Sequence, residues 1–227
     1  MPDAAEQVRF DAVPLFPLPN VVLFPRAVLP LHIFEERYRA MVFDALRGDS
    51  LIAMALLMPG WERDYYSRPA IEPVVCVGRI LTHERLPDGK YNLLLQGIAR
   101  ASVVREVAEP DRLYRAAELD RLVESRVMEI DLTEQRHRLI DIFEHRLRHV
   151  SGLARQFRQM LSSPLPTADI ADLVAFNLLE DVPLKQSLLA ETDVVRRVGR
   201  VIAALEEIEL VKPPISMPAG AENPSLN

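Results

Sequence analysis

The 227-residue sequence has one cysteine, one tryptophan and three lysines, and the shortages of cysteine and lysine each argue against a class of protein. Cys76 has no partner for an internal disulfide, and its apolar surroundings, VVCVG, predict a buried strand. A reducing cytoplasm is the compartment that fits this cysteine usage. The sequence also contains neither an apolar run of about eighteen residues nor a charged-then-apolar N-terminal stretch. We therefore predict neither a membrane span nor an export signal.

Catalytic motifs are equally scarce. A phosphate-binding loop needs two glycines five residues apart, followed by Lys and then Ser or Thr, whereas Gly89 and Lys90 are followed by Tyr91. A Ser-Lys protease needs a lysine that can accept the serine proton. Lys185 and Ser187 lie two residues apart in a helical segment, which places them on different faces. The sequence therefore predicts a protein that is not an enzyme and needs no cofactor.

Four polar residues have the spacing of a metal site on a helix. His137, Asp141, His145 and His149 follow one another at four-residue intervals, and neighbours at that spacing can chelate an ion. At about 100° per residue, however, this stripe lies opposite the apolar face of the same helix. We therefore interpret it as an exposed polar face and predict no metal site.

The charge balance disfavours nucleic acid as a partner. The formal net charge is −6 and the isoelectric point is about 5.5, so the whole molecule repels polyphosphate. Six arginines against three acids between Thr133 and Leu161 are the best argument for RNA binding. The sequence has no basic strand face studded with aromatic residues. RNA binding by this stretch remains the alternative function, and a solvated helix with scattered ion pairs is the simpler interpretation.

An early helix follows a proline-rich segment. Its apolar residues recur at helical spacing, and Gly48 stands where the helix is expected to end. Prolines recur every few residues before it, so we predict that Val21–Phe24 is a short strand near a sheet edge. The apolar helix positions are Tyr38, Met41, Val42, Ala45 and Leu46.

The following segments predict a sheet. The run at residues 50–58 fits a strand buried on both faces, and the proline-rich residues 58–73 fit a long loop. The Asp88-Gly89 pair predicts a two-residue type I′ hairpin, and Gly97 is expected to break the returning strand before two more. This gives about six strands and one helix, which suggests a small closed or nearly closed barrel over residues 13–123.

Beyond Ser125 the apolar period changes from two to 3.6, which predicts a helical bundle over residues 124–212. A long amphipathic helix is expected over residues 133–161. Thr167 is expected to cap the next helix, a short turn to follow Pro183, and a final helix to begin near Thr192. We predict that residues 1–12 are a flexible terminus and that residues 213–227 are a disordered tail. The fold class is therefore α+β.

The segment LPNVVLFPRAVLPLHIFEERYRAM, at residues 18–41, resembles the opening of the Lon N-terminal domain family, the module at the front of ATP-dependent Lon proteases. The segments LPDGKYNLLLQGIAR and IADLVAFNLLEDVPLKQSLLAETDVVRRV resemble later parts of it, so the resemblance spans residues 13–211. It implies a PUA-like β-barrel followed by a helical bundle. It also implies recognition of unfolded or extended polypeptide segments, with a separate protease as a second candidate partner. A full-length Lon protease carries its ATPase and Ser-Lys protease domains after this module, and the sequence ends before either.

The loop that contains the only tryptophan is the first candidate binding site. Trp61, Arg63, Tyr65 and Tyr66 lie within six residues, and Trp, Tyr and Arg are enriched at binding hot spots. The alternative is that the rings pack the loop onto the sheet.

A proline-rich ridge is the second candidate. Phe24, Pro25 and Leu29 combine apolar side chains with proline, which could leave a sheet edge open to an extended peptide. The alternative is that these residues belong to an ordinary core.

Overall fold

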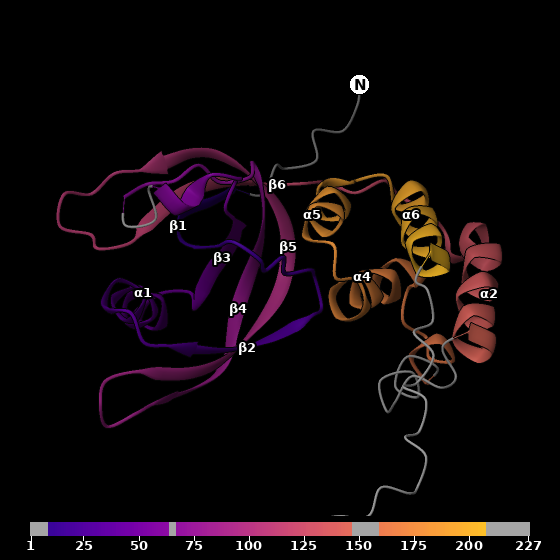
Figure 1. Cartoon of the computed structure of the whole chain (residues 1–227), viewed down its shortest axis with the longest axis horizontal. Coiled ribbons are helices and arrows are strands. Elements are labelled where there is room, and N and C mark those ends of the chain that lie inside the picture. The colour runs from indigo at the N-terminus through magenta and orange to yellow at the C-terminus, as the bar shows by residue number, and fades with distance from the viewer. Residues whose placement is uncertain (1–8, 64–66, 147–158, 208–227) are drawn as a thin grey trace, which may run out of the picture.

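The computed structural model describes residues 9–63, 67–146 and 159–207. Figure 1 shows the strands and α1 on one side and the remaining α-helices on the other, with α4 and α5 nearest the sheet and α2 farthest from it. The strands are β1 (Arg9–Leu18), β2 (Val28–Ile33), β3 (Leu51–Leu56), β4 (Val74–Arg85), β5 (Tyr91–Val107) and β6 (Arg115–Arg121). The α-helices are α1 (Glu36–Arg47), α2 (Thr133–Asp141), α4 (Thr167–Leu178), α5 (Val182–Ala190) and α6 (Val194–Glu207). Short helical turns are η1 (Trp61–Arg63), η2 (Glu129–Leu132) and the π-helical η3 (Ile142–Arg146).

The six strands form one mixed sheet in the order β2-β5-β4-β3-β1-β6, and β5 also pairs with β6. Strands β1 and β3 are parallel, and the other neighbours are antiparallel. The predicted α+β class is confirmed. The buried strand predicted after the first helix is β3, in which five of six residues are buried because both faces are covered.

The predicted strand at Val21–Phe24 is wrong. This segment connects β1 to β2 without strand pairing, and Val22, Leu23 and Phe24 are buried in the core. Pro25 follows directly, and the next residue, Arg26, adopts a positive φ of 69° and donates its N–H to the carbonyl of Gly97. The chain therefore turns here, and strand pairing begins only at Val28.

The predicted turn type is also wrong. The N–H of Gly89 donates to the carbonyl of Leu86, and the N–H of Leu86 donates to the carbonyl of Lys90, so the loop has three residues. Gly89 has a positive φ of 81°. A type I′ turn needs positive φ at both central residues. Asp88 is not among the described non-glycine residues with a positive φ, which excludes that geometry at Asp88-Gly89.

Gly97 does not end a strand, because β5 continues through it. The pairing with β4 shifts there, with Gly97 opposite Gly78 and Ala99 opposite Val77. A Cβ built on Gly97 would lie 2.1 Å from the carbonyl oxygen of Phe24. The glycine is therefore needed for the close approach of the β1–β2 connection, rather than for a turn.

The ends of the chain and its helical part also differ in detail from the prediction. β1 starts at Arg9, inside the predicted flexible terminus, while residues 1–8 and the predicted tail lie outside the described residues. Thr167 does not cap α4 with its own side chain. Instead the carboxylate of Glu129 accepts the Thr167 N–H at 3.0 Å and its hydroxyl at 2.7 Å. The predicted turn after Pro183 is the helix α5, which Asp181 caps by accepting the N–H of Leu184.

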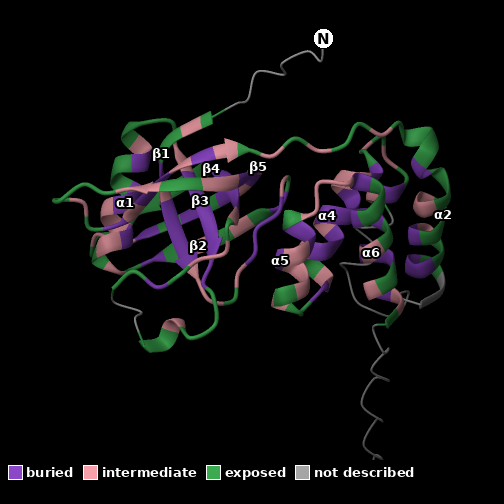
Figure 2. Ribbon diagram, turned by 90° about the horizontal axis from the view of Figure 1, so that it is seen from above, coloured by how far each residue is buried: buried purple, intermediate pink, exposed green. Residues whose placement is uncertain are grey.

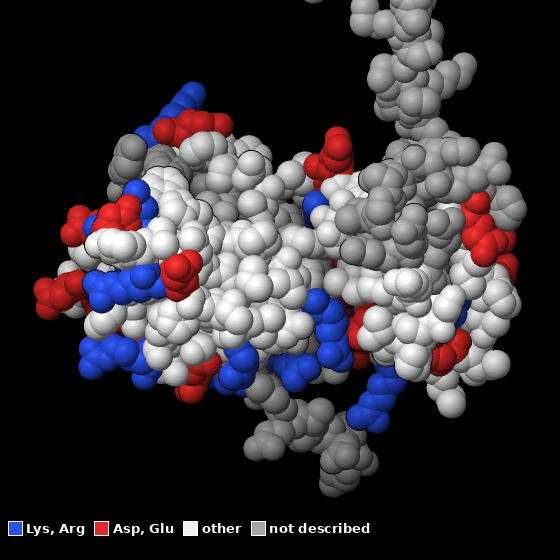
Figure 3. Space-filling view, turned by 90° about the horizontal axis from the view of Figure 1, so that it is seen from below, with Lys and Arg blue, Asp and Glu red and all other residues white. Residues whose placement is uncertain are grey.

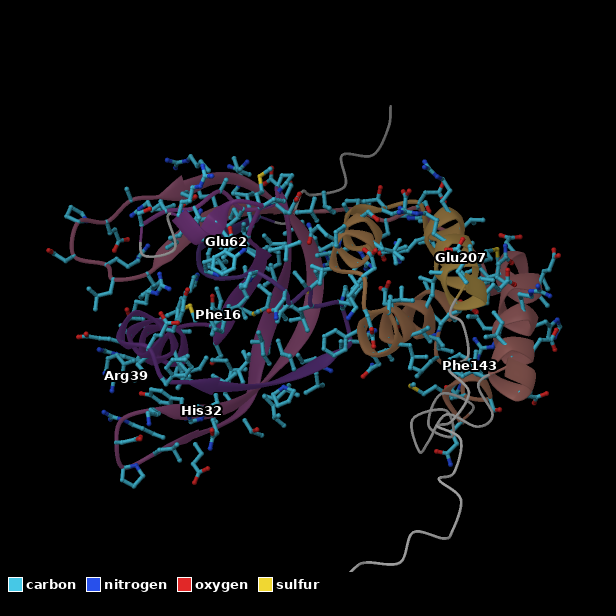
Figure 4. All side chains as sticks on the ribbon, viewed as in Figure 1. Phe16, His32, Arg39, Glu62, Phe143 and Glu207 are labelled. Atoms are coloured by element: carbon cyan, nitrogen blue, oxygen red, sulfur yellow. The ribbon has the colours of Figure 1, made fainter. Side chains whose placement is uncertain are left out.

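One hydrophobic cluster runs through the sheet and the helices. It includes Phe16 between α1 and the sheet and Phe143 among the helices, both labelled in Figure 4. Leu139, Phe143 and Leu161, on the apolar face of the helix predicted over residues 133–161, are buried, and the section at residues 147–158 lies outside the described residues. Figure 2 shows the buried residues concentrated on β3, on β4 and on the inner faces of the helices. The two parts of the chain are thus packed against each other through a shared core.

Candidate functional site

A groove of about 500 Å³ lies where α5 meets the sheet. The sheet side comes from the ends of β1 and β3, the start of β4 and the segment around η1, and the helix side comes from one face of α5. The lining is mainly apolar and contains one charged residue, Glu72. It consists of Pro19, Leu56, Leu57, Pro59, Trp61, Glu72, Pro73, Val74, Val182, Pro183, Gln186, Ser187 and Ala190.

Trp61 is the residue of the aromatic loop that the structure places in this groove. It opens η1, and its side chain is half-buried. Arg63 ends the same turn and is exposed, but it does not line the groove. Tyr65 and Tyr66 lie outside the described residues. The segment is positioned by hydrogen bonds from the Leu57 N–H to the Leu18 carbonyl and from the Met58 N–H to the Ala70 carbonyl.

Gln186 supplies a polar group at the groove. Its side chain is 7% exposed, and its Nε2 donates to the carbonyl of Val74 at 2.8 Å. This bond joins α5 to the first residue of β4 across 112 positions of sequence. Ser187 beside it donates to the carbonyl of Leu184 and accepts from Arg200. The hydroxyl is therefore committed within the helical part.

The three residues of the predicted proline-rich ridge differ in how far they are buried. Phe24 is completely buried, with the Arg100 guanidinium 5.9 Å from its ring centre, so its surface is part of the core. Pro25 and Leu29 are half-buried, and Leu29 lies on β2 opposite Leu95. Among the described strands β2 pairs only with β5, which leaves its other edge open. His32, labelled in Figure 4, lies on this edge strand.

The face beside that edge strand carries little charge. Figure 3 shows a broad uncharged surface across the middle of the face seen from below, with basic and acidic side chains around it. Val28 on β2 and Leu94 on β5 are each more than a third exposed. Basic side chains lie along the lower rim of this view, outside the uncharged surface.

The arginines of the described part of α2 are committed to the protein itself. Arg136 donates to the carbonyls of Leu161, Ser163 and Leu165 and to the hydroxyl of Thr167. Arg138 pairs with Glu206 of α6 at 2.6 Å. These contacts favour a structural role over the RNA-binding alternative.

The structure also shows the surroundings of the other residues that the sequence singled out for catalysis or metal binding. Lys185 donates to the carbonyl of Phe176 at 2.8 Å, and burial lowers its pKa. It is not bonded to Ser187, whose hydroxyl has other partners. His137 and Asp141 of the polar stripe are exposed, and the side chains of His145 and His149 lie outside the described residues. Within the described helices, none is long and apolar enough to cross a membrane.

Sequence reasoning identified Trp61 but missed the helix that faces it. The α5 contribution comes from Val182, Pro183, Gln186, Ser187 and Ala190, about 120 residues further along the chain. The segment KQSLLAE carried part of the family resemblance, which was the only signal for this helix. Its place opposite Trp61 depends on tertiary packing.

The fold and the groove define a class of protein: a mixed α+β module whose sheet and helices together form an apolar groove. Residues 12–207 match the family model of the ATP-dependent protease La (LON) substrate-binding domain, so the chain belongs to that family. This match confirms the resemblance found in the sequence.

The relatives and solved structures agree with that assignment. The Lon protease of Azorhizobium caulinodans is 26% identical over 202 residues, which are 85% of this chain and 22% of that protein. The Lon protease of Trichlorobacter lovleyi is 29% identical over 203 residues, which are 87% of this chain and 24% of that protein. The chain thus spans about a quarter of the length of the curated relatives that it matches.

The N-terminal domain of the Mycobacterium avium complex Lon protease has a similar fold. Its TM-score is 0.68 at 16% identity, over 88% of this chain and all of that one. The Lon N-terminal domain protein from Xanthomonas campestris gives a TM-score of 0.60 at 24% identity, over 86% of this chain and 98% of that one. At these identities the similarity establishes the fold alone.

Proposed function

We propose that this protein is a non-catalytic module that binds unfolded or extended polypeptide segments in the Trp61 groove. Membership of the substrate-binding domain family supports a polypeptide partner. The observation that carries the proposal is the groove itself, which places Trp61 and three prolines, Pro19, Pro59 and Pro73, opposite α5 with one charged residue in the lining.

The size and chemistry of the groove suit an apolar side chain of a partner. A volume of about 500 Å³ exceeds that of a single aromatic side chain, and burial of apolar surface contributes about 25 cal/mol per Å². Tryptophan and proline offer rigid surfaces, so little conformational entropy is lost when a partner binds. Arg63 is a further candidate contact for the same partner, and Tyr65 and Tyr66 remain candidates on their sequence alone. Pro25 and Leu29 form a second, weaker site along the open edge of β2.

The resemblance to the Lon family supports three further proposals. Residues 13–123 form a PUA-like barrel domain, and the additional pairing of β5 with β6 favours its closure. Residues 124–212 form a helical bundle domain. The module works in the cytoplasm beside a separate ATP-dependent protease that degrades what the groove holds.

Fluorescence of Trp61 tests the binding proposal directly, because it is the only tryptophan in the sequence. We expect a saturable change when a permanently unfolded, carboxymethylated polypeptide is titrated into the protein. Ala190→Glu should weaken this binding at least tenfold, since it adds a charge to the groove at an exposed position that tolerates it. Leu113→Glu is the matched control, because Leu113 is 58% exposed and does not line the groove. No binding by the unaltered protein, or equal binding by both variants, would contradict the proposal.

A further inference from the structure

The side-chain amide of Gln186 has a fixed orientation. A backbone carbonyl only accepts hydrogen bonds, so the atom that faces Val74 must be the nitrogen Nε2. The 2.8 Å bond between them therefore also fixes the position of the oxygen Oε1 on the same side chain. Because Gln186 is 93% buried and lines the groove, this oxygen has few directions in which to point.

Within the described part of the chain, no hydrogen bond to Gln186 Oε1 is found. The oxygen is also absent from the fully buried polar atoms that lack a partner, so it retains contact with solvent. The groove is the described cavity that Gln186 lines. A hydrogen-bond acceptor of fixed orientation thus lies beside an apolar surface. A partner that displaced water from Gln186 Oε1 without donating a hydrogen bond to this oxygen would bind poorly.

We infer that Gln186 Oε1 accepts a hydrogen bond from a backbone N–H of an extended polypeptide segment whose neighbouring large apolar side chain lies against Trp61. This inference rests on the proposed function and specifies how the groove recognises its partner. An extended chain supplies an N–H donor and a side chain at every residue, so it can satisfy the acceptor and fill the groove at once.

The charge of the lining restricts the class of segment. Glu72 is the one charged residue of the lining, and the lining includes no Lys or Arg that could pair with a phosphate or carboxylate. An acidic segment would meet only repulsion there. The expected partner is therefore an apolar segment with neutral or basic flanks.

Backbone substitution in the ligand tests this inference without altering the protein. The probe is a short capped peptide with one central phenylalanine among alanine and serine residues, with Trp61 fluorescence as the signal. In a series of depsipeptides, each amide in turn is replaced by an ester, which removes one N–H donor. We expect one ester, next to the phenylalanine, to weaken binding by roughly 3- to 10-fold.

A protein variant then identifies the acceptor. Gln186→Met keeps the shape of the side chain and removes both polar atoms, so the sensitive ester should cause no further loss in that variant. Thermal unfolding of Gln186→Met checks that α5 remains packed on β4. If the amide peptide binds but every ester peptide binds equally well, the inference is overturned and the proposed function stands. An ester effect that persists undiminished in Gln186→Met also overturns it, whereas failure of the amide peptide to bind counts against the proposed function itself.

A second arm tests the charge preference. Replacing the flanking serines of the peptide by aspartates should weaken binding several-fold, and Glu72→Gln should reduce this difference. Glu62→Gln is the matched control, because Glu62 is exposed and does not line the groove. Equal binding of the acidic and neutral peptides would overturn the charge preference.

Discussion

Arg100 on β5 donates from its Nη2 to Asp172 Oδ1 on α4 at 2.6 Å, and both side chains are only 2% exposed. Arg197 of α6 donates to the same carboxylate oxygen at 3.0 Å. Glu124, in the segment between β6 and η2, pairs with both guanidinium groups at 2.9 and 2.7 Å. This cluster joins the sheet to two helices. Arg100, Asp172 and Arg197 are almost completely buried, while the Glu124 side chain is 36% exposed, so the three buried charges depend on one another for their stabilisation.

Removing the charge of Asp172 is therefore expected to destabilise the fold. Asp172→Asn leaves two buried guanidinium groups with Glu124 as their remaining carboxylate, and breaking such a pair costs about 3–5 kcal/mol in the free energy of unfolding. Urea unfolding measures this change. Glu118→Gln is the matched control, because Glu118 pairs with Arg105, whose side chain is 66% exposed. It should cost less than about 1 kcal/mol. Equal losses in the two variants would show that the buried cluster contributes no more than a surface pair.

Replacement by alanine is expected to have opposite effects on stability at two glycines, Gly97 and Gly199. Gly97→Ala places a Cβ 2.1 Å from the Phe24 carbonyl oxygen, which is backbone and cannot rotate away. We expect a loss of more than about 3 kcal/mol in the free energy of unfolding, because β5 or the β1–β2 connection must shift. Gly199 lies in α6 with nothing within 4 Å of a built Cβ, so Gly199→Ala should stabilise the protein by about 0.5–1 kcal/mol. A stable Gly97→Ala variant would show that this close approach is not required.

Contacts between distant parts of the chain, such as the one at Gly97, separate the features that could be predicted from the sequence from those that could not. Periodicity predicted α1, because burial of one face dictates the spacing of apolar residues, and a continuous apolar run predicted β3, which is covered on both faces. Gly97 was expected to break a strand because the sequence does not show which distant backbone a glycine faces. The aromatic loop was likewise predicted from its composition, while Gln186 was missed because its partner Val74 lies 112 positions away. Local patterns predict elements, but contacts between distant segments need the structure.

The thiol of Cys76 provides a probe of opening of the sheet. The side chain is completely buried in β4, and burial raises its pKa to about 12. Alkylating and disulfide reagents react with the thiolate, so the folded protein should resist them at pH 8 and react only after denaturation. Reaction with a chromogenic disulfide, with and without urea, measures this. Rapid labelling of the native protein, at a rate independent of added urea, would contradict the buried placement of this strand.

Tyr114 predicts a specific loss of stability at alkaline pH. Its hydroxyl donates to Asp44 Oδ2 of α1 at 2.8 Å. Burial and this contact with a carboxylate raise the tyrosine pKa from 10.0 to about 12. The folded protein thus keeps the proton that an unfolded chain releases near pH 10, so the contribution to stability is complete below pH 10 and is lost as the pH rises towards 12. Tyr114→Phe removes the titrating group and should unfold with a weaker dependence on pH in this range, although it is less stable than the unaltered protein at pH 7 by about 1 kcal/mol. Urea unfolding between pH 9 and 12 measures both slopes. If the two proteins lose stability in parallel, the hydrogen bond between Tyr114 and Asp44 of α1 does not control the alkaline transition, and other tyrosines must account for it.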